Sequence, residues 1–211
     1  MNTHKFFEVV LDFVFPPSCG ICEKIGEGYL CKSCEKELEK YLYSNNAKDK
    51  FHLYKYTGII RKRLIQYKFN EKTYLKDFFY ESIIKNKKAC EFLQCYDIIL
   101  PVPIHKKRKK QRGYNQSELI ARKIAKKLDL EVYNNVLIKI KNTKPQSLMG
   151  VKERRKNAKG VYFVESVDKI KDKNVIILDD IYTTGTTANE CIKMMKKAGA
   201  KKVAIFTIAK D

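Results

Sequence analysis

The segment from Val175 to Thr187 combines two carboxylates, four threonines and one glycine. Four apolar residues precede the acidic pair Asp179 and Asp180, and the small residues that follow are Thr183, Thr184, Gly185, Thr186 and Thr187. Backbone N–H groups at the start of a helix, together with threonine hydroxyls, can cradle a phosphate dianion. Two carboxylates at a strand end can accept hydrogen bonds from a cis-diol or act in the second shell of Mg²⁺. Phosphate, diol and metal together describe a phosphorylated ribose, whereas a plain helix cap would account for only one exposed carboxylate.

Two stretches rich in cations are candidates for a leaving group that carries negative charge. The first follows Pro101-Val102-Pro103 and is strongly basic, and its candidate anion contacts are Lys106, Arg108 and Arg112. Fixed cations stabilise the charge that builds on a departing pyrophosphate. A solvated basic loop explains the same run, and Asn115 can also cap the helix that follows it.

The second stretch spans residues 141–160 and has no apolar periodicity. A loop of this length inside a compact domain is commonly a lid over a site. Its candidate contacts to the pyrophosphate are Gln146, Arg154 and Arg155. The alternative is a disordered basic linker.

Four cysteines form two C-x2-C pairs, Cys19 with Cys22 and Cys31 with Cys34, separated by eight residues. Each pair can hold one side of a tetrahedral ion, and two pairs complete a closed shell that leaves no open position for catalysis. A redox pair and an iron–sulfur cluster are the alternatives, but two pairs so close together favour structural Zn²⁺. Because so short a segment buries little core, the metal would supply its folding energy.

The elements that must position these residues alternate along the chain. Strand patterns occur at 51–56, 97–100, 132–140, 162–164, 175–178 and 203–208, and helical spacing at 58–67, 74–84, 115–128 and 187–197. This alternation predicts an α/β fold with a mostly parallel sheet and helices on both faces. Ligands of such sheets bind beyond the carboxyl ends of the strands, which selects the loops 101–114, 141–160 and 179–187.

The chain has 211 residues, 44% of them hydrophobic, which suffices for one α/β domain and a small appendage. Lysine and arginine number 44 against 24 acidic residues, a formal net charge of +20. This excess favours a polyanionic partner such as nucleic acid, phosphates or an acidic membrane surface. A highly solvated surface is the alternative.

The first fifteen residues are apolar in patches interrupted by Glu8 and Asp12, with no small-residue cleavage site after them. We expect a short amphipathic helix that packs on the protein, because the run is too short to span a bilayer. We therefore expect a cytoplasmic protein with no transmembrane segment, in which Cys90, Cys95 and Cys191 are small buried thiols. The polar stretch 44–50 predicts two domains, 1–45 with the N-terminal helix and cysteines, and 46–211.

The segment from Asp179 to Thr187 resembles the signature of the type I phosphoribosyltransferases. In that family the acidic pair holds the ribose hydroxyls of phosphoribosyl pyrophosphate (PRPP), and the threonine-rich loop holds its 5′-phosphate. The segment 141–157 resembles the flexible loop of the glutamine-dependent amidophosphoribosyltransferases. Phosphoribosyl transfer by such a site would require Mg²⁺ with PRPP.

An ordered set of short motifs from Cys19 to Lys210 resembles the ComF family, which is associated with competence. Its members in this chain are the paired cysteines, Tyr54, Tyr56, Gly58, Lys68, Phe69, Pro101-Val102-Pro103, Arg112 to Gln116, Thr143 to Gln146, and Asp179 to Gly185. The resemblance implies a type I phosphoribosyltransferase-like domain after a small zinc knuckle with four cysteine ligands. It also implies a link to DNA uptake or nucleobase salvage, with proteins of the competence machinery as partners.

Two functions follow from these features. The first is a glycosyltransferase that moves phosphoribosyl from PRPP to an acceptor, although no residue marks the acceptor site or a general base. The alternative is a non-catalytic module that grips single-stranded DNA through its lysines, zinc knuckle and stacked aromatics. We expect Phe51, Tyr54 and Phe69 to lie in the core instead. The acidic pair favours the enzyme, because its carboxylates would repel DNA phosphates.

Overall fold

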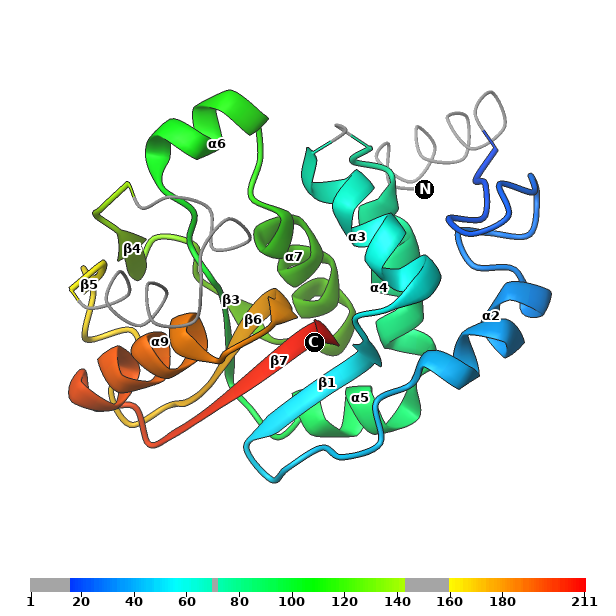
Figure 1. The fold of residues 1–211 in the computed structure, drawn as a ribbon. Coiled ribbons are helices and arrows are strands. Elements are labelled where there is room, and N and C mark those ends of the chain that lie inside the picture. The colour runs from blue at the N-terminus through cyan, green and yellow to red at the C-terminus, as the bar shows by residue number, and fades with distance from the viewer. Residues whose placement is uncertain (1–15, 70–71, 143–159) are drawn as a thin grey trace, which may run out of the picture.

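A five-stranded parallel sheet forms the centre of the molecule (Figure 1). The computed structural model describes residues 16–69, 72–142 and 160–211. Its strand order is β1-β7-β6-β2-β3, and all neighbouring strands in it run parallel. The strands of this sheet are β1 (Lys50–Lys55), β2 (Ile98–Pro101), β3 (Glu131–Val132), β6 (Asn174–Tyr182) and β7 (Lys202–Lys210). The predicted parallel α/β fold is therefore confirmed.

Helices cover both faces of the sheet because β6 is apolar on both sides. Ile176 and Leu178 pack toward α3 (Gly58–Phe69), α4 (Leu75–Lys85) and α7 (Gln116–Leu128). Val175 and Ile177 pack toward α9 (Thr186–Lys197), on the other face. Figure 1 shows α9 on one side of the sheet, with α3 and α4 on the opposite side. A second, antiparallel pair, β4 (Leu137–Lys139) with β5 (Tyr162–Val164), extends the α9 side.

Several elements differ from the predictions. The strand expected at 132–140 divides into β3 and β4, which belong to different sheets. Strand β6 does not end at residue 178, because β7 continues to pair with it as far as Tyr182 opposite Lys210. The expected loop 101–114 contains α6 (Lys106–Arg112), and α5 (Lys87–Leu93) was not predicted. Both helices have seven residues. None of the residues of α6 is buried, so the sequence of α6 has no apolar periodicity from which a helix could be predicted.

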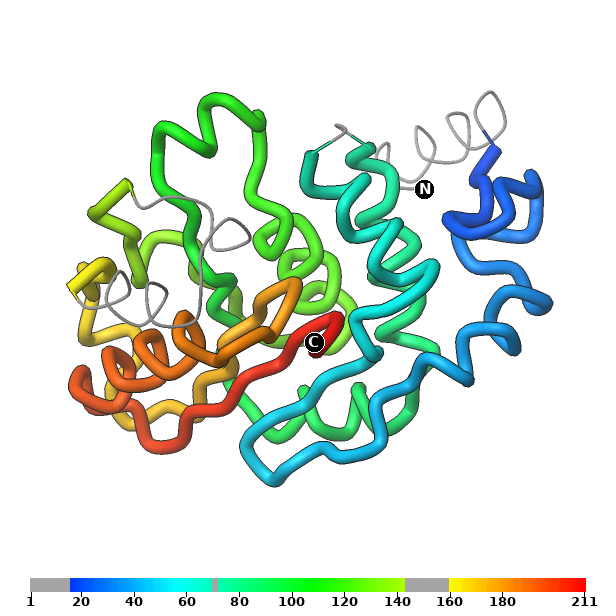
Figure 2. The backbone as a smooth tube through the Cα atoms, in the orientation of Figure 1, coloured from blue at the N-terminus to red at the C-terminus, as the bar shows by residue number. Residues whose placement is uncertain are grey.

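The cysteine-containing segment packs directly on the helices of the sheet domain (Figure 2). It continues through α2 (Lys32–Leu38) and the short 3-10 helix η1 (Glu39–Tyr41). The buried Arg63 of α3 donates to the carbonyl oxygen of Ile21 at 2.5 Å, and Lys85 of α4 donates to that of Leu30 at 2.8 Å. A Cβ on Gly20 would lie 2.5 Å from Phe78. The boundary between residues 45 and 46 stays a prediction, since the buried side chains of both parts form one cluster.

The predicted amphipathic helix within residues 1–15 lies outside the described residues. Within the described ranges, no helix is long and apolar enough to cross a membrane. Of the three scattered cysteines, Cys191 is buried as expected, Cys90 is half-buried, and Cys95 is exposed, contrary to the prediction. Cys95 follows the end of α5, where its thiol donates to the carbonyl oxygen of Glu91 instead of packing in the core.

Candidate functional site

A cavity of about 720 Å³ opens at the carboxyl ends of β2 and β6. The two loops that follow these strands line it, as the sequence predicted, and α3 and the β4–β5 pair complete it. The charged and hydroxyl-bearing side chains of its lining include those of Lys68, Arg108, Arg112, Lys139, Asp179, Asp180, Thr183 and Thr187. The third predicted loop includes Gln146, Arg154 and Arg155, which lie outside the described residues.

The acidic pair lies within β6, three and two residues before the strand ends at Tyr182. One oxygen of the Asp179 carboxylate accepts the backbone N–H of Asp180 at 2.9 Å and lies 3.5 Å from the Ser117 hydroxyl. The Asp180 carboxylate pairs with the Lys68 ammonium at 2.7 Å. Burial raises the pKa of Asp179, and the adjacent charge of Asp180 raises it further, while Lys68 opposes both effects. Asp179 and Asp180 thus place hydrogen-bond acceptors on one wall of the cavity, and the Lys68 ammonium is paired with one of them.

The threonine-rich loop turns the chain from β6 into α9. Gly185 stands at the N-cap of α9 with φ of 71°, a left-handed conformation that glycine adopts without strain. Because Gly185 has no side chain, no side-chain cap occupies the first turn of the helix. The hydroxyls of Thr184 and Thr186 lie 2.8 Å apart. Amides and hydroxyls at a helix N-terminus are the groups that bind phosphate.

Four of the five loop residues line one or both of two adjoining hollows. Thr183 and Thr187 line the main cavity together with the acidic pair. Gly185 and Thr186 line a small adjoining depression, which Thr183, Thr187 and Asp179 also line. The predicted phosphate loop therefore presents only part of its length to the main cavity.

The basic segment forms α6, whose N-cap is His105 and whose C-cap is Gly113. The ring nitrogen Nδ1 of His105 accepts the N–H of Lys107 at 3.3 Å. Arg108 and Arg112 line the cavity, whereas Lys106 is exposed and does not. Burial lowers the pKa of Arg112, and the Asp180 charge opposes that effect. The N-cap role expected of Asn115 is confirmed, because its side chain accepts the N–H of Ser117 at 3.2 Å.

Several lining residues were not predicted as part of the site, among them Lys68, Lys139, Tyr162 and Phe69. Lys139 and Tyr162 belong to β4 and β5, the strands that flank the predicted lid. Their position on either side of that segment is the sequence feature that could have identified them as lining residues. Burial lowers the pKa of Lys139, and the charge of Arg108 adds to this effect. Phe69, expected in the core, is 58% exposed at the last position of α3, where the Arg112 guanidinium lies 5.4 Å from its ring centroid. Phe51 and Tyr54 are buried as expected.

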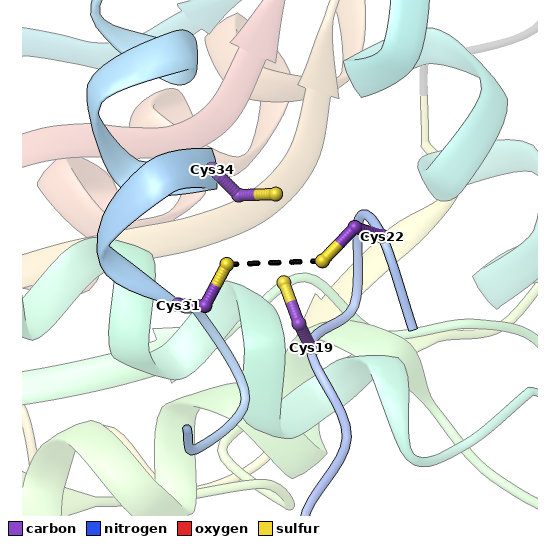
Figure 3. A group of neighbouring side chains, drawn as sticks. All are labelled: Cys19, Cys22, Cys31 and Cys34. Atoms are coloured by element: carbon purple, nitrogen blue, oxygen red, sulfur yellow. Dashed lines mark hydrogen bonds between the residues drawn. The ribbon is translucent and has the colours of Figure 1, made fainter. Parts of the chain in front are cut away.

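The four paired cysteines converge at the start of α2 (Figure 3). All four sulfur atoms lie within 4.8 Å of one another, and the Cys22 and Cys31 sulfurs are 3.7 Å apart. A tetrahedral ion with Zn–S bonds of about 2.3 Å sets its sulfurs about 3.8 Å apart. Burial disfavours the Cys19 thiolate, but backbone hydrogen bonds from Cys22, Cys31 and Ile21 outweigh burial and lower the Cys19 pKa to about 7. The cluster is consistent with a closed structural zinc site.

Two family models match the parts of the chain that contain these residues. The family model described as phosphoribosyl transferase domain matches residues 115–211. The one described as double zinc ribbon domain matches residues 10–45. The first match contains the acidic pair and the threonine-rich loop, and the second contains all four clustered cysteines.

Relatives of the chain carry names related to competence and DNA use. Competence protein F of Haemophilus influenzae is 25% identical, over 88% of this chain and 92% of that protein. Competence protein ComFC of Bacillus subtilis is 23% identical, over 92% and 77%. DNA utilization protein YhgH of Escherichia coli K12 is 26% identical over 56% of this chain, which spans about half of its length (51%). A purine phosphoribosyltransferase structure from Pyrococcus horikoshii aligns over 77% of this chain and 89% of its own, at 19% identity and a TM-score of 0.42.

The motifs found in the sequence lie at two places in the structure. The paired cysteines form the cluster on α2, and the acidic pair and threonine-rich loop form one wall of the cavity. Along most of its length the chain is similar to competence proteins of the ComF type, and it matches a double zinc ribbon at its N-terminal part followed by a phosphoribosyl transferase domain.

Proposed function

We propose that the chain binds PRPP with Mg²⁺ in the main cavity and transfers its phosphoribosyl group to an acceptor. The observation that carries this proposal is the position of the acidic pair and of two loop threonines on one wall of the cavity. The carboxylates of Asp179 and Asp180 accept hydrogen bonds from the ribose diol, and the N-terminus of α9 holds the 5′-phosphate. Mg²⁺ bound with PRPP beside Asp179 and Asp180 would supply positive charge to the site.

The cations of the cavity would act on the leaving group. As the bond between C1 of ribose and the pyrophosphate oxygen breaks, that oxygen keeps the electron pair and an acceptor atom bonds to C1. Arg108, Arg112 and Lys139 line the cavity from α6 and β4, where their fixed charges can stabilise the departing pyrophosphate. We keep Gln146, Arg154 and Arg155 as proposed lid contacts to the same group.

We also propose that the cysteine cluster holds one structural Zn²⁺. Four thiolates saturate the tetrahedral shell, so this ion has no position for substrate. Because the cluster segment packs on α3 and α4, the metal would also fix the surface on which those helices rest.

Free thiols and a PRPP site fit a cytoplasmic location.

The double variant Asp179→Asn with Asp180→Asn tests the PRPP site. Each amide keeps the side-chain shape but loses the charge that receives the diol hydroxyls, so affinity for PRPP with Mg²⁺ should fall by about 100-fold or more. Isothermal calorimetry measures the affinity, and circular dichroism checks that the fold is retained. The matched control is Asp168→Asn with Asp172→Asn, which removes the same charge from two exposed positions. A folded acidic-pair variant that binds PRPP like the wild type would place the site elsewhere.

Single-stranded DNA is a second candidate ligand, favoured by α6. This helix carries six cations in seven residues, buries none of them, and forms part of the cavity rim. The names of the relatives point to the same class of partner. Bound DNA would follow the rim, with α6 lying against its phosphates.

Binding of single-stranded DNA should weaken steeply with salt, because each neutralised phosphate contributes a slope of roughly −0.7 in the plot of log affinity against log salt. Replacing Lys106 and Lys110 by glutamine should make that slope shallower by roughly 1.4 if both lysines contact phosphates. Fluorescence anisotropy at several salt concentrations measures this slope. Replacing Lys126 and Lys127, exposed at the far end of α7, is the charge-matched control. Affinity that is absent at low salt or independent of salt refutes this candidate.

A further inference from the structure

The acidic pair already holds a cation, the ammonium group of Lys68. Lys68 is the penultimate residue of α3, and its Nζ lies 2.7 Å from Oδ2 of Asp180. The Lys68 side chain is 24% exposed and that of Asp180 is 9% exposed. A contact so short between mostly buried groups is a charge-assisted hydrogen bond in a medium of low polarity, and it is stronger than a surface ion pair. Both residues line the cavity.

The charges around Asp180 come from three elements. Asp179 adds a second carboxylate on β6, while Lys68 on α3 and Arg112 on α6 supply nearby positive charge. Of these two cations, Lys68 is the one that forms an ion pair with the Asp180 carboxylate. The ammonium therefore occupies an oxygen of Asp180 that a metal or a hydroxyl donor would otherwise engage. A divalent ion that approaches this wall meets a lysine already in place.

We propose that Lys68 is the resident counter-ion of the acidic pair and sets how strongly the site depends on a divalent cation. This inference rests on the proposed PRPP function for its second consequence only. The first is that the wild-type pair binds a free divalent ion weakly, because the ion must displace the ammonium or share Asp180 with it. The second is that PRPP keeps appreciable affinity without Mg²⁺, because Lys68 supplies part of the positive charge that the metal would bring.

The decisive comparison uses Mn²⁺ alone, whose binding can be followed by electron paramagnetic resonance without any substrate. In the Lys68→Met variant the pair loses its counter-ion and gains one unit of net negative charge. Its affinity for Mn²⁺ should rise by about 10-fold or more over the wild type. The zinc-loaded full chain is used throughout, so that the cysteine cluster does not take up Mn²⁺. Lys68→Arg keeps the charge and should stay near the wild type.

A matched control separates this effect from a general change in charge. Lys62→Met removes a cation from an exposed position of the same helix and should leave Mn²⁺ affinity unchanged. Lys68→Gln, which keeps a polar side chain, serves if Lys68→Met does not fold, and should likewise bind Mn²⁺ more tightly. A folded Lys68→Met or Lys68→Gln variant with wild-type affinity for Mn²⁺ overturns the proposal.

A calorimetric titration of PRPP with and without Mg²⁺ tests the second consequence. The ratio of the two affinities should be about 10-fold larger in Lys68→Met than in the wild type. If wild-type protein fails to bind PRPP at all, the proposed function fails, but the Mn²⁺ comparison still decides the role of Lys68. If PRPP binds and the ratio does not change, Lys68 has only a structural role and the proposal is wrong.

Discussion

Replacing Cys31 by serine is expected to release the metal and to unfold the segment from residue 16 to about residue 45. A serine hydroxyl does not replace a thiolate ligand at neutral pH, and the three remaining sulfurs leave the tetrahedral shell open. Structural zinc contributes about 10–16 kcal/mol in isolated zinc-finger peptides. The loss here should be smaller, because Leu30 and Leu38 also pack against the larger domain. Elemental analysis should show zinc falling from about one ion per chain to none.

Cys95→Ser is the control for this experiment, because it removes an exposed thiol that lies outside the cluster. Its zinc content and its resistance to proteolysis should match those of the wild type. Limited proteolysis should cut the Cys31→Ser variant within the cysteine segment first. Wild-type protein that contains no zinc, or that contains iron with acid-labile sulfide, would contradict the assignment of the metal.

The contacts of the segment predict how far the damage extends. The Arg63 guanidinium donates to the Ile21 carbonyl oxygen and lies 3.3 Å from the Glu23 carboxylate. If the segment unfolds, this guanidinium loses these two partners and keeps the Gln66 side-chain oxygen at 2.9 Å, and the loss of the partners of a buried charge is costly. Because Arg63 lies on α3, amide hydrogen exchange in α3 should become faster when zinc is lost. Lys68 lies on the same helix. The sheet itself should keep its protection, because β6 and β7 pair independently of the cysteines.

The parts of the fold that the sequence predicts well are those whose signal is local. The apolar run Val175 to Leu178 identifies the central strand, and the small residues after it identify the turn into α9. The spacing of the two cysteine pairs predicts the cluster, because the ligands of one ion must lie within a few ångströms of one another. Each of these patterns is short, so chain connectivity already restricts the geometry.

The parts that the sequence does not predict depend on contacts between distant segments. Phe69 has the apolar side chain of a core residue. It is exposed beside Arg112 because α3 ends there, at the cavity. Lys139 lies near Arg108 because β4 and α6 border the same cavity, which no local pattern records. The pair of Lys68 with Asp180 joins α3 to β6 and has no sequence spacing that would reveal it. Helix α6 has no buried face, so hydrophobic periodicity could not find it.

Gly185→Ala is expected to lower the affinity for PRPP by about 100-fold or more while leaving most of the fold intact. An alanine at φ of 71° costs about 1–2 kcal/mol in backbone strain alone. Its Cβ would also overlap the ring and hydroxyl of Tyr182, which lies just before the loop. Tyr182 has little freedom to withdraw, because its ring packs against His52 with centroids 4.8 Å apart. The loop should therefore shift and carry the amides of α9 out of position for the phosphate.

Gly199→Ala separates the strain from the overlap. Gly199 also has a positive φ, 86°, but a Cβ there meets only ordinary contacts, the nearest at 3.5 Å, and it follows the opposite end of α9. Both variants should lose a similar amount of stability from strain, about 1–2 kcal/mol, and only Gly185→Ala should lose about 100-fold or more in PRPP affinity. Adding Tyr182→Leu to Gly185→Ala removes the overlapping atoms and should restore part of the binding. Equal affinities for PRPP in the two glycine variants would show that the loop does not hold the phosphate.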